Sequence, residues 1–125
     1  MVEHAWPVSL LGWVVVVLKR HCEALHELSW DEWQEFADLQ FSLLKAMTDR
    51  APLEKEYLAC FAEKEGFRHL HFHLVPKGPG FDAQYAGSKA FHYINPDPEE
   101  VLEPQAVAAY CRELASVLAA FREVR

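Results

Sequence analysis

One stretch decides the fold: His69-Leu70-His71-Phe72-His73-Leu74-Val75-Pro76, in which histidines and apolar residues alternate. Successive side chains of a β-strand point to opposite faces of its sheet. We therefore predict a strand over residues 69–75, with its apolar side chains in the core. The three histidines would share the other face, roughly 6.5 Å apart at each step.

Other segments supply the partners of this strand. Short extended or β-branched runs predict strands at Val2–Trp6, Trp13–Leu18, Glu56–Ala62 and Ala90–Ile94. A capping box at Ser29 and Glu32 predicts a helix to about Thr48, and Pro104 suits the first turn of a helix that ends near residue 123. This order predicts an α+β fold with an antiparallel sheet of about five strands and two main helices.

The length of 125 residues suits one domain, which we place at 1–125 with its core at 12–77. The run from Val8 to Leu18 is shorter than the ~20 apolar residues of a membrane span. Glu3 and His4 stand where a signal peptide would be basic. Three cysteines without a Cys-x-x-Cys pair fit reduced thiols. We therefore expect a cytoplasmic protein without a membrane partner.

The formal net charge of −7 argues against binding of long nucleic acids, which requires a broad basic surface. A small phosphate-bearing ligand remains compatible with this charge, because local fields dominate at short range. Basic and neutral donors gather in two places, at residues 19–21 and 68–77. These two segments are the candidates for a phosphate site.

Three interpretations of the histidine row compete. The first is a solvated polar face without a special role. The second is a metal site, although the outer pair lies about 13 Å apart along a strand, so that one metal would need further ligands such as Glu65 or His21. The third is covalent catalysis on a phosphoryl centre, in which one imidazole attacks, a neighbour orients it and another binds the anionic group. His71 has an imidazole neighbour on both sides, which favours it as the nucleophile.

The His69–Pro76 stretch resembles the motif of the histidine triad superfamily of nucleotide hydrolases and nucleotidyl transferases. Upstream, residues 12–21 read Gly-Trp-Val-Val-Val-Val-Leu-Lys-Arg-His and are similar to that family's Gly-His-x-Leu-Val-Ile-Pro-Lys-x-His segment. The resemblance covers roughly residues 12–77 and extends to bacterial proteins like diadenosine tetraphosphate hydrolase.

The resemblance implies roles for four histidines. His71 would attack the α-phosphorus and form a nucleotidyl-histidine that water then resolves. His73 would contact the phosphate. His69, paired with His21, would hold the ring of His71 in the productive tautomer. For His21, a solvated histidine at the end of a basic turn stays open as an alternative.

Substrate contacts are expected from residues that differ from the family pattern. Glu65 stands where many members have glutamine, and Lys77 where they often have arginine; Arg68 is a further basic candidate. The N-terminal ribose pocket of the family is expected to be absent or rebuilt from His4, Trp6 and Val8. Trp6 is thereby a candidate to stack on a base.

The expected function is hydrolysis or nucleotidyl transfer at the α-phosphate of a dinucleoside polyphosphate or a nucleoside phosphoramidate. No metal is expected in the nucleophile's site, although Mg²⁺ could accompany a polyphosphate substrate. The resemblance also implies a homodimer. A nucleotide-binding protein of this fold with little turnover, and a metal-binding histidine strand, remain the alternatives.

Overall fold

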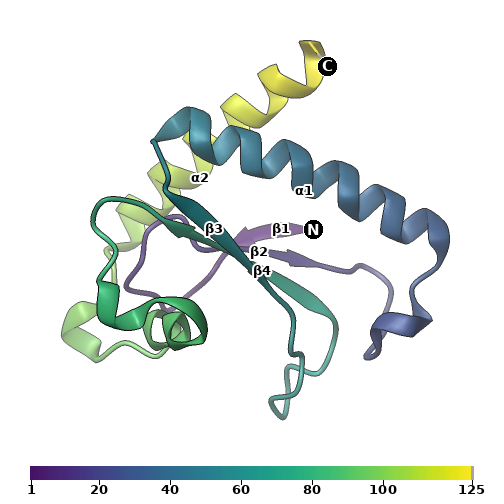
Figure 1. The fold of residues 1–125 in the computed structure, drawn as a ribbon, viewed down its shortest axis with the longest axis horizontal. Coiled ribbons are helices and arrows are strands. Elements are labelled where there is room, and N and C mark those ends of the chain that lie inside the picture. The colour runs from purple at the N-terminus through teal and green to yellow at the C-terminus, as the bar shows by residue number, and fades with distance from the viewer. Residues whose placement is uncertain (125) are drawn as a thin grey trace.

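A computed structural model describes residues 1–124 and shows a four-stranded sheet with two long helices (Figure 1). The strand order is β1-β2-β4-β3, and every neighbouring pair is antiparallel. The strands and α-helices are β1 (Val2–His4), β2 (Val14–Val17), α1 (Trp30–Arg50), β3 (Lys55–Ala59), β4 (His71–Lys77) and α2 (Pro104–Val124). Four 3₁₀-helices complete the structure: η1 (Leu25–Glu27), η2 (Ala83–Tyr85), η3 (Gly87–Ile94) and η4 (Pro98–Glu100).

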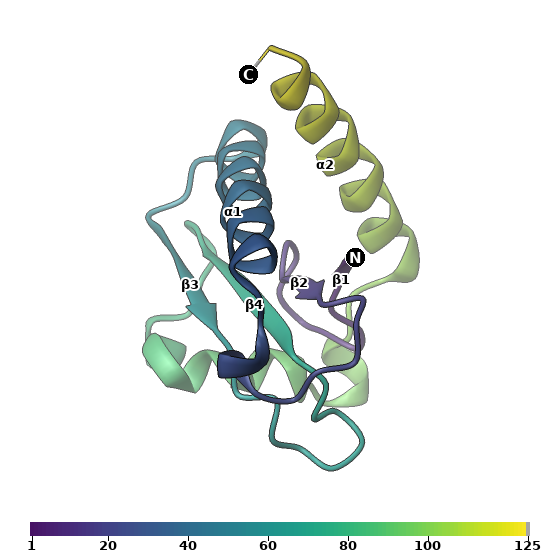
Figure 2. The same ribbon diagram turned by 90° about the vertical axis from the view of Figure 1, so that its right-hand side faces the viewer.

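The central strand β4 carries the alternating stretch, and its two faces meet different parts of the chain. Phe72 and Leu74 are buried in one cluster with Leu43 of α1 and Tyr110 of α2. Figure 2 shows both helices on this side of the sheet. The prediction that Leu70, Phe72 and Leu74 enter the core is confirmed, since all three are at most 7% exposed.

The opposite face of the sheet is partly covered by the segment 79–102, which contains η2, η3 and η4 (Figure 2). Val75 is buried there with Val8, Trp13, Ala90 and Tyr93. Backbone hydrogen bonds from Ser9 N–H to the Tyr93 carbonyl and from Leu102 N–H to the Val8 carbonyl, both 2.9 Å, fasten the segment to the N-terminal region. The histidine face is therefore closed at its Val75 end.

The N-terminus of α1 forms as the sequence predicts. The Ser29 side chain accepts from the Glu32 N–H at 3.1 Å, and the Glu32 carboxylate accepts from the Ser29 N–H at 2.9 Å. Within residues 1–124, neither α1 nor α2 is apolar enough over its length to cross a membrane.

The loop before β2 requires glycine at position 12. Its φ is +95°, in the region that L side chains rarely adopt. A Cβ built there would lie 3.1 Å from both Pro76 Cγ and Tyr110 Oη. The close approach of β4 and α2 to this loop thus depends on the missing side chain.

The prediction of about five strands is wrong by one, because residues 90–94 belong to η3 rather than to a strand. Ala90 and Tyr93 are both buried, at a spacing that suits a helical turn and not an alternating strand. Strand boundaries also differ. β3 ends at Ala59 rather than Ala62, and β4 begins at His71 rather than His69.

Candidate active site

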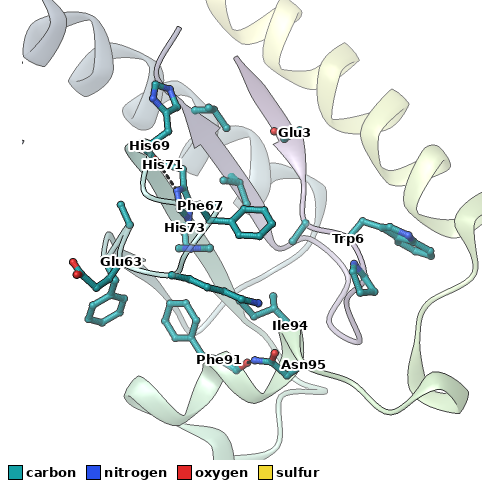
Figure 3. Close-up of a pocket in the computed structure, with 18 of the residues that line it drawn as sticks. Glu3, Trp6, Glu63, Phe67, His69, His71, His73, Phe91, Ile94 and Asn95 are labelled. Carbon is teal, nitrogen blue, oxygen red and sulfur yellow. Dashed lines mark hydrogen bonds between the residues drawn. The ribbon is translucent and has the colours of Figure 1, made fainter. Parts of the chain in front are cut away.

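A pocket of about 730 Å³ opens on the histidine face of the sheet (Figure 3). Its base is formed by His71 and His73 of β4 with Val15 and Val17 of β2, which pair with them in register. The N-terminal segment and the connection between β3 and β4 form opposite walls, and η3 closes one end. The residues that line the pocket around this base include Glu3, His4, Trp6, Phe61, Glu63, Lys64, Phe67, His69, Phe91, Ile94 and Asn95.

His69 lines the pocket, but both of its ring nitrogens bind the backbone of the segment after β2. Nε2 donates to the Leu18 carbonyl, and Nδ1 accepts from the Cys22 N–H at 3.2 Å. The backbone of Leu70 pairs with the same segment, with its N–H bonded to the Cys22 carbonyl at 2.8 Å. His69 therefore lies on the same side as His71 and His73 although it precedes β4, and its ring binds the segment after β2.

His71 is oriented by a backbone carbonyl. Its Nδ1 lies 2.8 Å from the His69 carbonyl oxygen, which accepts and so requires the proton on Nδ1. Nε2 then carries the lone pair, and no residue between 1 and 124 is found bonded to it. The contact expected from the ring of His69 is thus made by that residue's main chain.

His73 has the opposite arrangement of protons. It is 8% exposed, and its Nδ1 accepts from the indole N–H of Trp13 at 3.0 Å. Burial, together with the neighbouring His71, lowers the pKa of His73 from 6.5 to about 4. At neutral pH the ring is uncharged with its proton on Nε2, so that it can donate one hydrogen bond.

The structure brings His21 and His69 together, as the resemblance implied. Their rings stack with centroids 5.3 Å apart and an interplanar angle of 14°. The side chain of His21 is 76% exposed, its Nε2 lies 3.3 Å from Glu23 Oε2, and it does not line the pocket. His21 contacts the triad through the ring of His69.

The expected substrate contacts divide into one that reaches the pocket and three that do not. Trp6 lines it and is 53% exposed. Lys77 binds Glu54 at 3.4 Å at the far end of β4, and Arg68 binds Glu23 at 3.2 Å. The exposed Glu65 lies in the turn between Lys64 and Phe67, whose other members line the pocket.

Two aromatic residues of the pocket, Phe61 and Phe67, were not predicted from the sequence. Phe61 and Phe67 are 67% and 59% exposed at its edge, and Phe91 packs edge-on against the rings of Phe61, Trp13 and His73. Phe61 and Phe67 belong to no periodic pattern along the chain, so no sequence signal marked them as part of a binding surface.

The N-terminal strand adds Glu3 to the pocket wall, whereas His4 is held in a structural role. His4 Nδ1 donates to the Ala5 carbonyl and Nε2 accepts from the Gly12 N–H, both at 2.9 Å. Burial lowers the pKa of His4, in keeping with this neutral ring. Val8 is fully buried away from the pocket. Of the three residues expected to rebuild a ribose pocket, Trp6 and His4 line the pocket on the histidine face, and Val8 does not.

The charge of the pocket is low. Among residues 1–124, Lys64 is the one lysine or arginine that lines the pocket. Glu3 and Glu63 are the acidic residues that line it. No group of three or more histidine, cysteine, aspartate or glutamate side chains within residues 1–124 is arranged to hold a metal ion. The nitrogens of His69 are committed to the backbone, which removes one of the three ligands that a histidine-strand metal site would use.

No protein-family model and no curated protein matches the sequence. Solved structures do match the structure of the chain. A hypothetical histidine triad nucleotide-binding protein from Sulfolobus tokodaii has a TM-score of 0.70 at 16% identity, over 97% of this chain and 78% of that one. A zinc-bound histidine triad family protein from Mycobacterium smegmatis has a TM-score of 0.68 at 15% identity, over 99% and 81%.

A third match is a Hit-like protein from Bartonella henselae involved in cell-cycle regulation, solved with an unknown ligand. Its TM-score is 0.61 at 12% identity, over 86% of this chain and 72% of that one. The chain thus has the histidine triad fold. The resemblance drawn from His69–Pro76 is confirmed at this level, as is the α+β class with an antiparallel sheet.

Proposed function

We propose that this protein binds a nucleotide in the pocket and cleaves it at the α-phosphorus through a covalent intermediate on His71. The supporting observation is the tautomer of His71: its Nδ1–H is bound by the His69 carbonyl, so its lone pair is on Nε2 at the pocket. An imidazole nucleophile needs this state, because a protonated nitrogen has no lone pair to donate.

The proposed reaction has two displacements at phosphorus. His71 Nε2 forms a bond to phosphorus while the bond to the leaving group breaks, and the leaving group takes a proton from water. The positive charge that develops on the ring is stabilised by the Nδ1–H bond to the His69 carbonyl. Water then attacks phosphorus, the N–P bond breaks and its electron pair returns to Nε2, and the proton that the attacking water loses neutralises the hydroxide left by the first step. The uncharged His73 donates from Nε2 to a phosphoryl oxygen in both steps.

The pocket's charge favours a nucleoside phosphoramidate over a dinucleoside polyphosphate as the substrate class. A polyphosphate chain needs several cations, and Lys64 alone among the lysines and arginines of the described chain lines the pocket. Lys77 and Arg68, expected to contact phosphates, are paired with Glu54 and Glu23 outside it. A substrate with a single phosphoryl group and an amine leaving group requires less positive charge.

Intact mass spectrometry after mixing with adenosine phosphoramidate or diadenosine tetraphosphate tests this proposal, with released AMP measured in parallel. We expect an adduct of one nucleotidyl group or AMP release with wild type, faster with the phosphoramidate. In His71→Ala both should fall by a factor of at least about 10³, the scale of losing a covalent nucleophile. His26→Ala is a control that should retain activity, because His26 is exposed on η1 and does not line the pocket.

The alternative is a nucleotide-binding protein with little turnover. It is favoured by the exposed position of Glu65 outside the pocket, because Glu65 then supplies no proton to the leaving group. Binding of AMP without an adduct or product from either substrate would select this alternative. With or without turnover, we propose that the protein binds a nucleotide. The homodimer and cytoplasmic location implied earlier remain proposals, which size-exclusion chromatography with light scattering and cell fractionation would test.

A further inference from the structure

Trp13 precedes β2 and is the largest of the fully buried side chains, with no exposed surface. Its indole packs edge-on against two rings of the pocket, His73 at 5.7 Å and Phe91 at 5.4 Å between centroids. Trp13 does not itself line the pocket. It lies behind His73 and belongs to the buried cluster that joins the segment 79–102 to the sheet.

The polar contact between the two residues has one possible direction. The indole N–H is a donor and offers no acceptor, so the 3.0 Å contact from Trp13 Nε1 requires a lone pair on His73 Nδ1. A protonated imidazolium would carry a hydrogen on both nitrogens and would meet the indole N–H with an N–H. The contact therefore opposes both the cation and the Nδ1–H tautomer.

We propose that Trp13 is a positioning residue, which holds His73 neutral with its proton on Nε2 so that His73 presents one N–H donor to the phosphoryl group. This inference rests on the proposed function for the identity of the acceptor, but the state of the His73 ring does not depend on substrate. Without the indole N–H, the buried ring would be free to exchange its proton between the two nitrogens.

Within residues 1–124, the neighbourhood of His73 supplies no competing partner that would fix the ring in this way. Phe91 from η3 and Trp13 just before β2 are uncharged, and the residues opposite His73 in the sheet, Val15 and Ala59, are apolar. Among the described residues, His71 is the titratable side chain whose ring contacts the ring of His73, with the two centroids 5.0 Å apart. Its Nδ1 is bonded to the His69 carbonyl, which leaves Trp13 as the group that selects the His73 tautomer.

Nitrogen-15 NMR of the wild-type protein without substrate tests the proposal first. Ring nitrogen shifts should report an Nε2–H tautomer for His73 at pH 7, and a scalar coupling across the N–H···N bond should join it to the Trp13 indole nitrogen. An Nδ1–H tautomer, a mixture of tautomers, or an absent coupling would overturn the proposal. This measurement requires no variant, and so it stands even if Trp13 proves essential for folding.

Trp13→Phe removes the N–H and keeps an aromatic ring, and Trp30→Phe is the matched control because Trp30 is 74% exposed on α1. In Trp13→Phe we expect His73 to populate both tautomers and AMP release from adenosine phosphoramidate to fall about tenfold, the effect of one hydrogen bond. Trp30→Phe should change neither. A folded Trp13→Phe protein whose His73 stays in the Nε2–H tautomer would contradict the assignment.

The two readouts separate this inference from the proposed function. If wild type releases no AMP and forms no adduct, the catalytic proposal fails, while the tautomer and the coupling still decide the role of Trp13. If wild type is active and His73 has the wrong tautomer, the role of Trp13 fails and the nucleophile at His71 is unaffected.

Discussion

At the scale of single residues, two histidines on one face of β4 carry their protons on different nitrogens. His71 donates a hydrogen bond from Nδ1–H to a carbonyl, and His73 accepts a hydrogen bond at Nδ1 from an indole N–H. The rings are 5.0 Å apart, so this difference is made by their partners and not by general surroundings. One ring is left with a lone pair for the pocket, and the other with a donor.

The lowered pKa of His73 predicts a dependence of stability on pH. The pKa is about 4 in the folded protein against 6.5 without the fold, so the unfolded chain binds more protons between these values. The free energy of unfolding should therefore fall as the pH falls from 6.5 to 4, by up to roughly 3 kcal/mol from this group. Urea titrations of wild type and His73→Gln across this range would measure it.

Because carboxylates also titrate at low pH, the informative quantity is the difference between the two proteins. Wild type should lose more stability than His73→Gln on going from pH 6.5 to 4, since the variant has no proton to bind there. Parallel curves would contradict the prediction. A titration of His73 by NMR in the wild type gives the same test without a variant, with a midpoint expected near pH 4.

The sequence predicted the faces of Leu70, Phe72 and Leu74 because strand alternation is a local property. It did not predict which nitrogen of each histidine is free. The partner of His73 is 60 residues away in sequence, and that of His71 is a main-chain carbonyl without any sequence signal. Proton positions in the site are set by contacts that only the folded chain brings together.

At the scale of elements, the start of α1 links the helix to the segment that holds His69. Glu32 closes the capping box and also accepts two hydrogen bonds from Arg20, at 2.9 and 3.2 Å. These bonds to Arg20 and to Ser29 lower the pKa of Glu32 to about 2. Arg20 lies between Leu18 and Cys22, the two residues whose backbone binds the ring of His69.

Ser29→Ala should therefore destabilise the protein by about 1 kcal/mol, the usual loss for an N-cap side chain. The Glu32 N–H would lose its acceptor at the first turn of α1. Chemical denaturation at neutral pH measures the change. Ser116→Ala is the matched control, because Ser116 is exposed within α2 and alanine suits a helix interior. Equal stability of Ser29→Ala and wild type would show that the cap contributes nothing.

Elements with a strong local signal were predicted well. The capping box gave the start of α1, Pro104 the start of α2, and the alternating stretch the central strand. The segment 90–94 was not predicted well, because five residues of which four, besides His92, are apolar or aromatic suit a strand and a helical turn equally. Packing of Ala90 and Tyr93 onto Val8 and Val75 decides in favour of η3.

At the scale of the whole molecule, the pocket is a product of topology. Its walls come from residues 3–7, from β2, from residues 61–73 and from residues 91–95, which meet only because β1, β2 and β4 are neighbours and η3 packs across them (Figure 3). The motif indicated its base from sequence. The aromatic wall and the exclusion of Lys77 and Arg68 depend on where the chain turns.

The aromatic wall leads to a prediction that separates binding from stability. Phe61 and Phe67 line the pocket although most of each side chain is exposed, so we expect them to contact the base of a nucleotide. The double variant F61S/F67S should bind AMP about tenfold more weakly, the scale of one lost stacking contact, with a change in unfolding free energy below about 1 kcal/mol. Isothermal titration calorimetry and urea unfolding measure the two quantities.

Leu58→Ser is the matched control for this pair, since Leu58 is 53% exposed on β3 and does not line the pocket. It should leave the affinity for AMP unchanged. A general loss of surface hydrophobicity would weaken binding in the control as well, which would remove the argument from the aromatic wall. Unchanged affinity in F61S/F67S would place the base elsewhere, against Trp6 on the opposite wall, because Trp6 is the other exposed aromatic residue that the described chain brings to this pocket.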